Sequence, residues 1–495
     1  MIVGTVAKSS EQVACRLHHR KIRAAIDLPA LSEIFGGLKA TSILGGNKAG
    51  SDAGRFSYWA AQPRRVLRLE DNHGNPFDRL RKALAAYSLK ETIPETLPQG
   101  IFAGGWIGCF GYELGRYIER VPRTTVDDLS MPLIRLCFYD RVICYDHAES
   151  AFILLALQLP NESETPREKL DFLEELLTRA QSVRTPLPQA GDVEQVDFSH
   201  IRCNMEKDYY LRAVEKVKRY IYDGEVYQVN FSQRFERDYS HRPIELFHWQ
   251  NVYNPSAYAA YIDSGDLQIV SASPEMFVTI ERGFIRTKPI KGTRARFKES
   301  SEAAVQANAE NLNELLRSEK ERAELNMIID LERNDLARIC KPGTRKVIQP
   351  RTIEAYPSVF HAVATVAGQL REEIGVCDVL KAMFPGGSVT GAPKIRSMEI
   401  IDRMEPTARG VYTGSIGFIG VDGTVCLNIA IRTVIISCRK AFVQAGGGIV
   451  ADSDPQAEWQ ETITKARALL AGIAIVQDGK TNQYDGRMGG EGGPA

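Results

Sequence analysis

The chain of 495 residues has nine cysteines, and none of them form a Cys-x-x-Cys pair. Their odd number and scattered positions argue against a disulfide framework and against a zinc site. Free cysteines are typical of a reducing compartment, so we expect a cytoplasmic protein. No apolar run approaches the roughly 18 residues of a membrane span, and no apolar signal-peptide core stands near the N-terminus.

Neither sign of charge prevails in the chain. Lysine plus arginine and aspartate plus glutamate number 62 each, which gives a formal net charge of zero. No overall field therefore attracts nucleic acid or an anionic membrane, and we expect neither as a partner. A small-molecule enzyme fits this composition better. The length allows two to four domains, or one large composite sheet with its helices.

Both ends of the chain lack apolar periodicity. Residues 1–25 are mixed and polar, and residues 478–495 are rich in glycine, so we predict that both ends are disordered. A segment rich in proline and glycine at 185–193 predicts a linker between an N-terminal region at 25–185 and a second region at 200–475.

Strands and helices are predicted in both regions. In the first, strands are expected at 134–145 and 151–158. In the second, Tyr210, Val214, Val217 and Ile221 follow helical spacing up to Gly224, which predicts an amphipathic helix with a glycine cap. Further strands are expected at 226–235, 258–262, 267–272 and 276–287.

Lys291 lies in the basic segment Thr-Lys-Pro-Ile-Lys-Gly-Thr-Arg-Ala-Arg at 287–296. A lysine followed by Gly-Thr after an apolar strand can be an amine nucleophile. Such a lysine must be desolvated or lie near other cations to attack at neutral pH, and Lys288, Arg294 and Arg296 are close in sequence. The segment taken alone is also typical of a solvated strand end, so both interpretations stay open.

Three glutamates are candidates for a magnesium site. Glu324 belongs to a helix that Ser318 is expected to cap. Glu458 and Glu461 are three residues apart in the first turn of a second predicted helix, so they share one face. Magnesium prefers a few carboxylates with water and an anionic ligand. Acidic residues in a first turn also interact favourably with the helix dipole, which is the alternative explanation for that pair.

Two glycine-dense segments, at 385–394 and 446–450, can present backbone N–H groups to an anion. The first has Walker-like glycine spacing, but Ala392 stands where a nucleotide-binding loop needs lysine, so we exclude nucleoside triphosphate binding. Each segment can also be a tight turn. Arg432 lies in the strand-like run 427–436 and is either a carboxylate clamp or a solvent-facing residue of an edge strand.

These motifs together resemble one family, the chorismate-utilising enzymes. The close resemblance covers about 200–475, and a weaker match at 104–113 extends it into the N-terminal region. The segments that carry it are 224–235, 272–277, 289–293, 322–335, 385–394, 446–452 and 458–462. The resemblance implies an α/β (α+β) fold, a large sandwich of two mainly antiparallel sheets with helices packed outside.

Two positions distinguish branches of the family. Isochorismate and salicylate synthases carry a lysine at the position of Gln228, where it activates water, and glutamine cannot act as that base. Anthranilate-forming members usually read Pro-Ile-Ala-Gly-Thr where this chain has Lys291. The resemblance therefore implies the branch that converts chorismate and ammonia to 4-amino-4-deoxychorismate for 4-aminobenzoate and folate synthesis. Anthranilate-type chemistry and a catalytically silent regulatory relative remain alternatives.

The resemblance also implies roles for individual residues. Lys291 attacks C2 of chorismate, and Glu275 protonates the departing 4-hydroxyl. Magnesium is held by Glu324 and Glu461, with Glu458 in support. The implied substrate-binding residues are Arg432, Tyr412, Gly446, Gly447, Gly448, Gln228, His361 and Thr390, with Lys394 as a further candidate. A buried structural role is an equal alternative for His361.

No glutaminase nucleophile motif of the form Gly-x-Cys-x-Gly is found in the chain. Ammonia is therefore expected from solution or from a separate glutamine amidotransferase subunit. A lyase that releases 4-aminobenzoate would also be a separate protein. Members of the family often bind tryptophan in the N-terminal half, but the sequence assigns no residues to such a site here.

Overall fold

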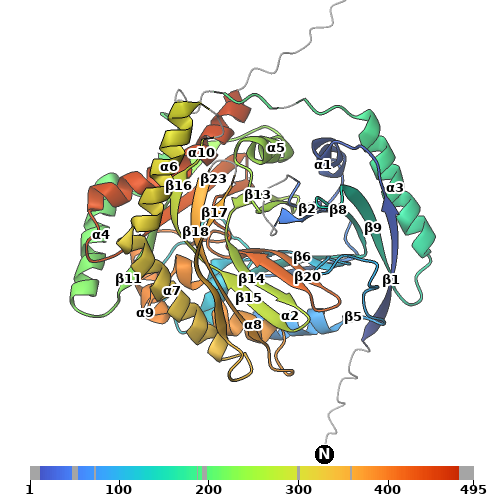
Figure 1. Cartoon of the computed structure of the whole chain (residues 1–495), viewed down its shortest axis with the longest axis horizontal. Helices are drawn as coiled ribbons and strands as arrows, with labels where there is room; N and C mark the ends of the chain where they lie inside the picture. The colour runs from blue at the N-terminus through green and yellow to red at the C-terminus, as the bar shows by residue number, and fades with distance from the viewer. Residues whose placement is uncertain are drawn as a thin grey trace, which may run out of the picture.

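The computed structural model of the chain describes residues 12–46, 54–71, 74–186, 188–191, 198–297, 301–356 and 359–478. Two large and mainly antiparallel sheets occupy its centre, and helices lie around them (Figure 1). This architecture confirms the predicted two-sheet fold with outer helices. Of the tail predicted at 478–495, only Asp478 is described, and it is the last residue of a helix.

The first sheet has 13 strands. Its order is β10 (Arg202–Cys203), β11 (Gln228–Asp238), β23 (Lys440–Ile449), β22 (Thr433–Ser437), β13 (Leu267–Ser273), β12 (Tyr258–Asp263), β2 (Ser42–Leu44), β3 (Phe56–Ala60), β8 (Arg141–Asp146), β9 (Ala151–Gln158), β1 (Val13–Ile22) and β5 (Tyr87–Leu89), with β19 (Gly391–Ala392) paired to β11. Among the described strands of this sheet, only β1 and β5 pair in parallel. Because β12 pairs with β2, the sheet runs continuously from the C-terminal region into the N-terminal region.

The second sheet has 10 strands. Its order is β16 (Ile290–Ala295), β18 (Val359–Gln369), β15 (Phe284–Lys288), β14 (Met276–Glu281), β21 (Val425–Asn428), β20 (Ser415–Gly420), β6 (Gly105–Phe110), β7 (Ile134–Tyr139) and β4 (Arg65–Leu69), with β17 (Lys346–Ala355) paired to β18. Here β20 pairs with β6, so this sheet also joins the two regions.

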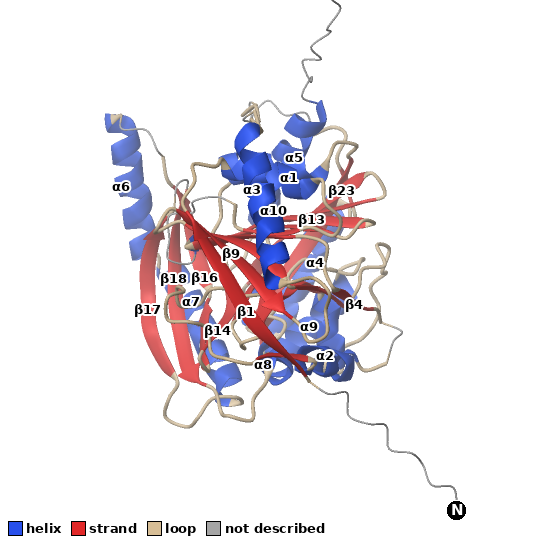
Figure 2. Ribbon diagram, turned by 90° about the vertical axis from the view of Figure 1, so that its right-hand side faces the viewer, coloured by secondary structure: helices blue, strands red, loops and turns tan. Residues whose placement is uncertain are grey.

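The helices cover the outside of the sheets. They are α1 (Leu28–Gly36), α2 (Pro76–Ala85), α3 (Pro166–Ser182), α4 (Lys207–Tyr222), α5 (Pro243–Tyr253), α6 (Glu302–Arg317), α7 (Glu319–Ala337), α8 (Val376–Met383), α9 (Lys394–Met404) and α10 (Pro455–Asp478), with the 3-10 turns η2 (Tyr112–Tyr117) and η3 (Gly387–Val389). Figure 2 shows α6 and the strands β17 and β18 at one edge of the molecule. Within the described ranges, no helix is long and apolar enough to cross a membrane.

The predicted helix caps are present. The side chain of Ser318 accepts a hydrogen bond from the backbone N–H of Glu321 and opens α7, as expected. Asp454 accepts one from Ala457 at 2.8 Å and opens α10. These caps satisfy N–H groups that have no partner within the helix. They fix the first turns of the two helices that carry the candidate metal-binding glutamates.

Disorder up to residue 25 was a wrong prediction, because β1 pairs in register with β9 from Arg16 to Ile22. All but one of the side chains of β1 are partly buried or exposed, which leaves a weak apolar pattern in the sequence. The predicted strand 134–145 is two strands that turn at Asp140, and 276–287 is two strands that turn at Arg282 and Gly283, where φ is positive. The run 427–436 is also interrupted, because Arg432 lies in a bend with a φ of 51°.

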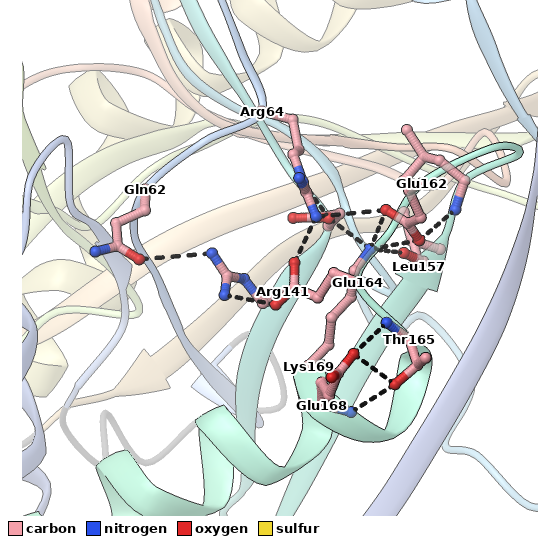
Figure 3. Close-up of polar contacts among 11 residues, drawn as sticks. Gln62, Arg64, Arg141, Leu157, Glu162, Glu164, Thr165, Glu168 and Lys169 are labelled. Atoms are coloured by element: carbon pink, nitrogen blue, oxygen red, sulfur yellow. Dashed lines mark hydrogen bonds and ion pairs between the residues drawn. The ribbon is translucent and has the colours of Figure 1, made fainter.

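A buried charge network explains the turn at Asp140. Lys169 of α3 is fully buried, and its Nζ lies 2.7 Å from Asp140 Oδ2 and 2.7 Å from Glu162 Oε2. It also donates to the carbonyl of Leu157 at 2.6 Å, and Figure 3 shows the lysine reaching Glu162 and that carbonyl. Arg64 pairs with Asp140 from the other side at 2.7 Å. Each buried charge thus has partners, which fastens α3 to β8 and β9.

A second buried pair ties the loop after α9 to the first sheet. The side chains of Arg409 and Glu405 are both 1% exposed and lie 2.6 Å apart. Arg409 also donates to the carbonyls of Val389 and Asn230, at 3.0 and 2.8 Å. Glu405 accepts the backbone N–H of Ser232 in β11 at 2.9 Å. The pair is thereby connected to β11 and to the glycine-rich segment 385–394.

The N-terminal region joins the same network through Glu113 of η2. Its carboxylate accepts the backbone N–H groups of Arg409 and Gly410, at 2.8 and 3.0 Å. Three segments that are far apart in sequence therefore meet at one buried arginine.

Replacing Arg409 with methionine should lower the free energy of unfolding by about 3–5 kcal/mol, because Glu405 would stay buried without its charge partner. Urea denaturation followed by circular dichroism would measure the loss. Arg371→Met is the matched control, since Arg371 pairs with Glu373 at the surface and should cost less than about 1 kcal/mol. Equal losses in the two variants would contradict the central role of Arg409.

Candidate active site

Lys291 on β16 lies beside Glu324 of α7. Its Nζ is 3.8 Å from Glu324 Oε2, and the two side chains are 14% and 18% exposed. The glycine that follows the lysine makes this approach possible. Gly292 has a φ of 98°, and a Cβ there would lie 2.8 Å from Oε2 of Glu321 on the same helix. The Lys-Gly-Thr sequence therefore lets α7 pack closely against β16.

Glu275 lies just before β14 and is 3% exposed. Its Oε1 accepts the backbone N–H of Ile290 at 3.3 Å, next to Lys291. Burial raises the pKa of the Glu275 carboxyl, while the ammonium groups of Lys291 and Lys465 oppose that shift from nearby. A buried carboxyl that favours its protonated form, close to a lysine, has the properties of a general acid.

Glu458 and Glu461 of α10 both face Gly447 of β23. A Cβ on Gly447 would lie 2.9 Å from Glu458 Oε2 and 3.6 Å from Glu461 Oε1. The glycines at 446–448 are therefore not a tight turn, because they belong to a strand that pairs with β11. The missing side chain at 447 leaves room for the two carboxylates.

Lys465 holds Glu461 in place. Its Nζ lies 2.6 Å from Glu461 Oε1 and donates to the carbonyl of Gly446 at 2.9 Å. Burial alone would raise the pKa of Glu461, but the ammonium groups of Lys465, Lys320 and Lys291 lower it. Glu458 differs, because burial raises its pKa despite a hydrogen bond from Ser453 at 2.6 Å.

The acidic side chains are of the kind that binds magnesium, but they are not spaced as the ligands of one ion. Across the described ranges, no three acidic, histidine or cysteine side chains lie close enough together to hold a metal ion. Glu458 and Glu461 do converge over Gly447, and Lys291 lies near both Glu324 and Glu461. An all-oxygen set of carboxylates that leaves positions for water and for an anionic ligand suits magnesium.

A cation without a counter-ion among the described residues, Arg432, lies near Tyr412 and His361. Arg432 is half-buried, and burial lowers its pKa while nearby Tyr412 opposes that shift. The described part of the chain offers Arg432 no carboxylate partner. Tyr412 is buried, which raises the pKa of its phenol. A guanidinium without a counter-ion beside a buried phenol can bind a carboxylate in two-point fashion.

His361 lies near enough to Arg432 for the charge of that arginine to act on it. Its Nδ1 shares a hydrogen bond of 2.8 Å with Thr293 Oγ1, two residues after the candidate nucleophile. Burial first, and then the charge of Arg432, lower the pKa of His361 to about 4. The ring is therefore neutral at pH 7.

The remaining predicted residues differ in whether their polar groups have hydrogen-bond partners. Gln228 is fully buried, and neither polar atom of its side chain has a hydrogen-bond partner among the described residues. A Cβ on Gly448 would lie 2.6 Å from Gln228 Nε2. The hydroxyl of Thr390 donates to the carbonyl of Gly386 at 2.9 Å. Lys394 binds Asp335 and the carbonyl of Met383, so its ammonium group is already engaged.

Several residues near the site were missed from the sequence. Lys465 follows Glu461 by four residues, so helical spacing could have indicated the pair. Glu321 was assigned only to the helix start, yet it accepts a hydrogen bond from Arg294 at 2.8 Å. No sequence pattern indicated Ser388 or Glu332 as site residues, because the 385–394 segment meets α7 only in the folded chain.

Comparison with known proteins gives a family match. A family model described as chorismate binding enzyme matches residues 48–471. Aminodeoxychorismate synthase component 1 of Bacillus subtilis (strain 168) is 39% identical over 377 residues, which cover 76% of this chain and 78% of that protein. Anthranilate synthase component 1 of Pseudomonas aeruginosa is 37% identical over 458 residues, which cover 88% of this chain and 90% of that protein.

Solved structures give the same fold. Anthranilate synthase component I from Streptococcus pneumoniae TIGR4 superposes with a TM-score of 0.72 at 31% identity, covering 85% of this chain and 93% of that one. The menaquinone-specific isochorismate synthase from Escherichia coli has a TM-score of 0.68 at 18% identity, with coverage of 94% and 96%, and supports the fold alone. The relatives include enzymes with different products at similar identity.

The buried His361 predicts an acid-dependent loss of stability. Its pKa of about 4 lies below the 6.5 of an exposed histidine, so unfolding is favoured when the unfolded chain can take up a proton. The stability that the neutral His361 ring contributes is fully present above pH 6.5. It is lost as the pH falls to 4, which lowers the free energy of unfolding by up to about 3 kcal/mol. The ring resonances should titrate near pH 4 by NMR.

Two variants test the sign of this effect. His361→Gln should reduce the loss of stability between pH 6.5 and 4, whereas His19→Gln, which changes an exposed histidine on β1, should leave it as in the wild type. A His361 resonance that titrates near 6.5 would show that the ring is not buried as described.

Proposed function

This chain belongs to the family of chorismate-binding enzymes, and we propose that within it the chain forms 4-amino-4-deoxychorismate from chorismate and ammonia. The observation that carries the proposal is the placement of Lys291, whose ammonium group lies among Glu324, Glu275 and Glu461 instead of in solvent. Its side chain is 14% exposed, so Lys291 meets the requirement of desolvation for an amine nucleophile.

In the proposed reaction, the Lys291 amine forms a bond to C2 of chorismate as the 4-hydroxyl leaves. Glu275 gives its proton to that hydroxyl, which departs as water. Ammonia then forms a bond to C4 and expels the Lys291 amine from C2. The protonated state that burial favours for Glu275 supports its role as the acid.

The carboxylates of chorismate need cationic and N–H partners. Arg432 has no counter-ion among the described residues, and we assign it one carboxylate, with Tyr412 beside it. Val443 is the last residue of β23 that pairs with β22. The glycines at 446–448 lie beyond it, and the edge of β23 at these glycines is therefore open to a ligand. We also assign substrate contacts to His361 and to Gln228, whose amide group is buried and unpaired among the described residues.

Magnesium is part of the proposal as a bound ion that would neutralise a substrate carboxylate. Glu324 and Glu461 would hold it, with Glu458 in support, because these carboxylates lie on the two helix starts that face Lys291 and Gly447. The role of Lys465 is to fix the orientation of Glu461.

Ammonia is proposed to come from a separate glutamine amidotransferase subunit, since the chain has no Gly-x-Cys-x-Gly motif.

Tryptophan is proposed to bind in a cavity of about 710 Å³ that is lined by residues of both sheets, among them Tyr58 and Tyr258. Glu281 lines this cavity too, and one of its buried carboxylate oxygens lacks a hydrogen-bond partner among the described residues, so it is free to accept from an ammonium group.

Anthranilate formation is the second candidate, because the relatives from Pseudomonas aeruginosa and Aquifex aeolicus, at 37% and 38% identity, are anthranilate synthase components. The two reactions differ in which carbon retains the nitrogen. A lysine adduct at C2 blocks that carbon and directs ammonia to C4, so Lys291 favours the first candidate.

Purified protein incubated with chorismate, magnesium and ammonium should form aminodeoxychorismate, identified by mass and by conversion to 4-aminobenzoate with an added lyase. Lys291→Ala should reduce turnover at least about 100-fold, because the nucleophile is lost. Lys288→Ala is the control, since Lys288 pairs with Glu354 and should retain activity. Anthranilate as the wild-type product would move the chain to the second candidate.

Glu461→Gln should weaken magnesium binding at least about tenfold, because a direct carboxylate ligand is lost. Isothermal titration calorimetry with magnesium would measure this without turnover. Glu372→Gln removes an acid whose side chain is 92% exposed and should leave the affinity unchanged. Equal affinity in the Glu461 variant and the wild type would place the ion elsewhere.

A further inference from the structure

A pair of buried carboxyl groups lies behind the site on α7. Glu332 and Asp335 are 3% and 5% exposed. A single ammonium group, that of Lys394 on α9, contacts Asp335 at 2.5 Å. Oε2 of Glu332 is buried and has no hydrogen-bond partner among the described residues. One lysine can compensate only one of these two charges, and it contacts Asp335.

The environment therefore favours a neutral Glu332. Burial, followed by the charge of Asp335, raises the pKa of Glu332 to about 8, while Lys394 opposes the shift. Burial also raises the pKa of Asp335, but Lys394 and Arg338 favour its ionised form. Of the two carboxyls, Glu332 is the one that keeps its proton at neutral pH.

The η3 turn lies between Glu332 and the carboxyl group of Glu275. A Cβ on Gly387 would lie 3.3 Å from Glu332 Oε1, so the turn packs directly against this carboxyl. The next residue, Ser388, is 5% exposed, and its hydroxyl makes no close hydrogen bond among the described residues. This hydroxyl is near enough to Glu275 to favour its ionised form, and Glu275 in turn acts on the charge state of Glu332.

We propose that Glu332 is a positioning residue for Glu275, keeping the far side of the Gly387–Val389 turn uncharged so that Glu275 can give up its proton. The inference rests on the proposed function, in which Glu275 protonates the leaving hydroxyl. Glu332 touches neither substrate nor reacting atoms in this scheme. It acts only through the charge that it presents to Glu275.

The electrostatic reason is the cost of placing two anions close together in a buried site. When Glu275 donates its proton to the departing hydroxyl, it becomes a carboxylate, and Glu332 keeps its own proton throughout. If Glu332 is already ionised, the new carboxylate forms beside a like charge and Glu275 is a weaker acid. Lys291 and Lys465 lie near Glu275, whereas Lys394, which also lies near Glu332, pairs with Asp335.

The test is the pH dependence of kcat for the wild type and Glu332→Gln, at saturating chorismate and magnesium and at a constant concentration of free ammonia. In the wild type, kcat should fall with an apparent pKa near 8, to about a tenth of its plateau at pH 9. Glutamine keeps the shape without the charge, so the fall near pH 8 that Glu332 causes should be absent from the variant, and any alkaline fall that remains should belong to the ionisation of Glu275 itself. Glu372→Gln, at an exposed acid, should behave as the wild type does.

An alkaline fall that is unchanged in folded Glu332→Gln overturns the inference while leaving the proposed function intact. A wild type that forms no aminodeoxychorismate refutes the proposed function first. If the glutamine variant does not fold, Glu332→Leu offers the same loss of charge. Infrared spectroscopy is the independent measurement: a protonated-acid band that the wild type shows, that Glu332→Gln lacks and that disappears near pH 8 supports the inference, whereas identical bands in the two proteins at pH 7 overturn it.

Discussion

The buried ion pair of Arg409 and Glu405 is the constraint on which the site depends. It cannot be exposed to water without separating β11 from the segment after α9, and it cannot lose one partner without leaving a buried charge. Both Gln228, at the start of β11, and Tyr412, three residues after Arg409, are positioned by this connection. Glu113 adds the N-terminal region to the same point. This wall of the candidate site is thus held by electrostatics, while the apolar cores of the two sheets supply most of the burial.

The main role of the glycines in the motifs is to leave room for neighbouring side chains. Gly447 leaves room for the two glutamates of α10, and Gly292 lets α7 come close to β16. A side chain at either place would meet a carboxylate oxygen within 3 Å, so the acidic residues and the lysine could not share one site. This explains why glycine-dense segments in this sequence resemble anion-binding turns and yet, at 446–448, form part of a regular strand.

Much of this arrangement could be read from the sequence, because it depends on local pattern. The caps of α7 and α10 and the shared face of Glu458 and Glu461 follow from local spacing, and the two-sheet class follows from the family resemblance of the motifs. What could not be predicted depends on tertiary contacts. The strand β1 is too polar to show an apolar face, and the bend at Arg432 interrupts a run that reads as one strand. The contact of Gly387 with Glu332 joins segments more than 50 residues apart, for which no local signal exists.

The carboxyl groups of the site fall into two classes, and the difference between them is physical. Glu275 and Glu332 are almost wholly buried, and for both of them burial dominates and favours the protonated acid. Glu461 lies near three lysines, which together overcome burial and favour the carboxylate. Environments that separate the pKa values of like groups allow one fold to provide both an acid and an anionic ligand at the same pH. Lys291 lies between the two classes, within range of Glu275 on one side and of Glu324 and Glu461 on the other. A nucleophile at this boundary is close to the acid that must protonate the leaving group and to the carboxylates that can hold a cation over the ring, which is the placement that the proposed reaction requires.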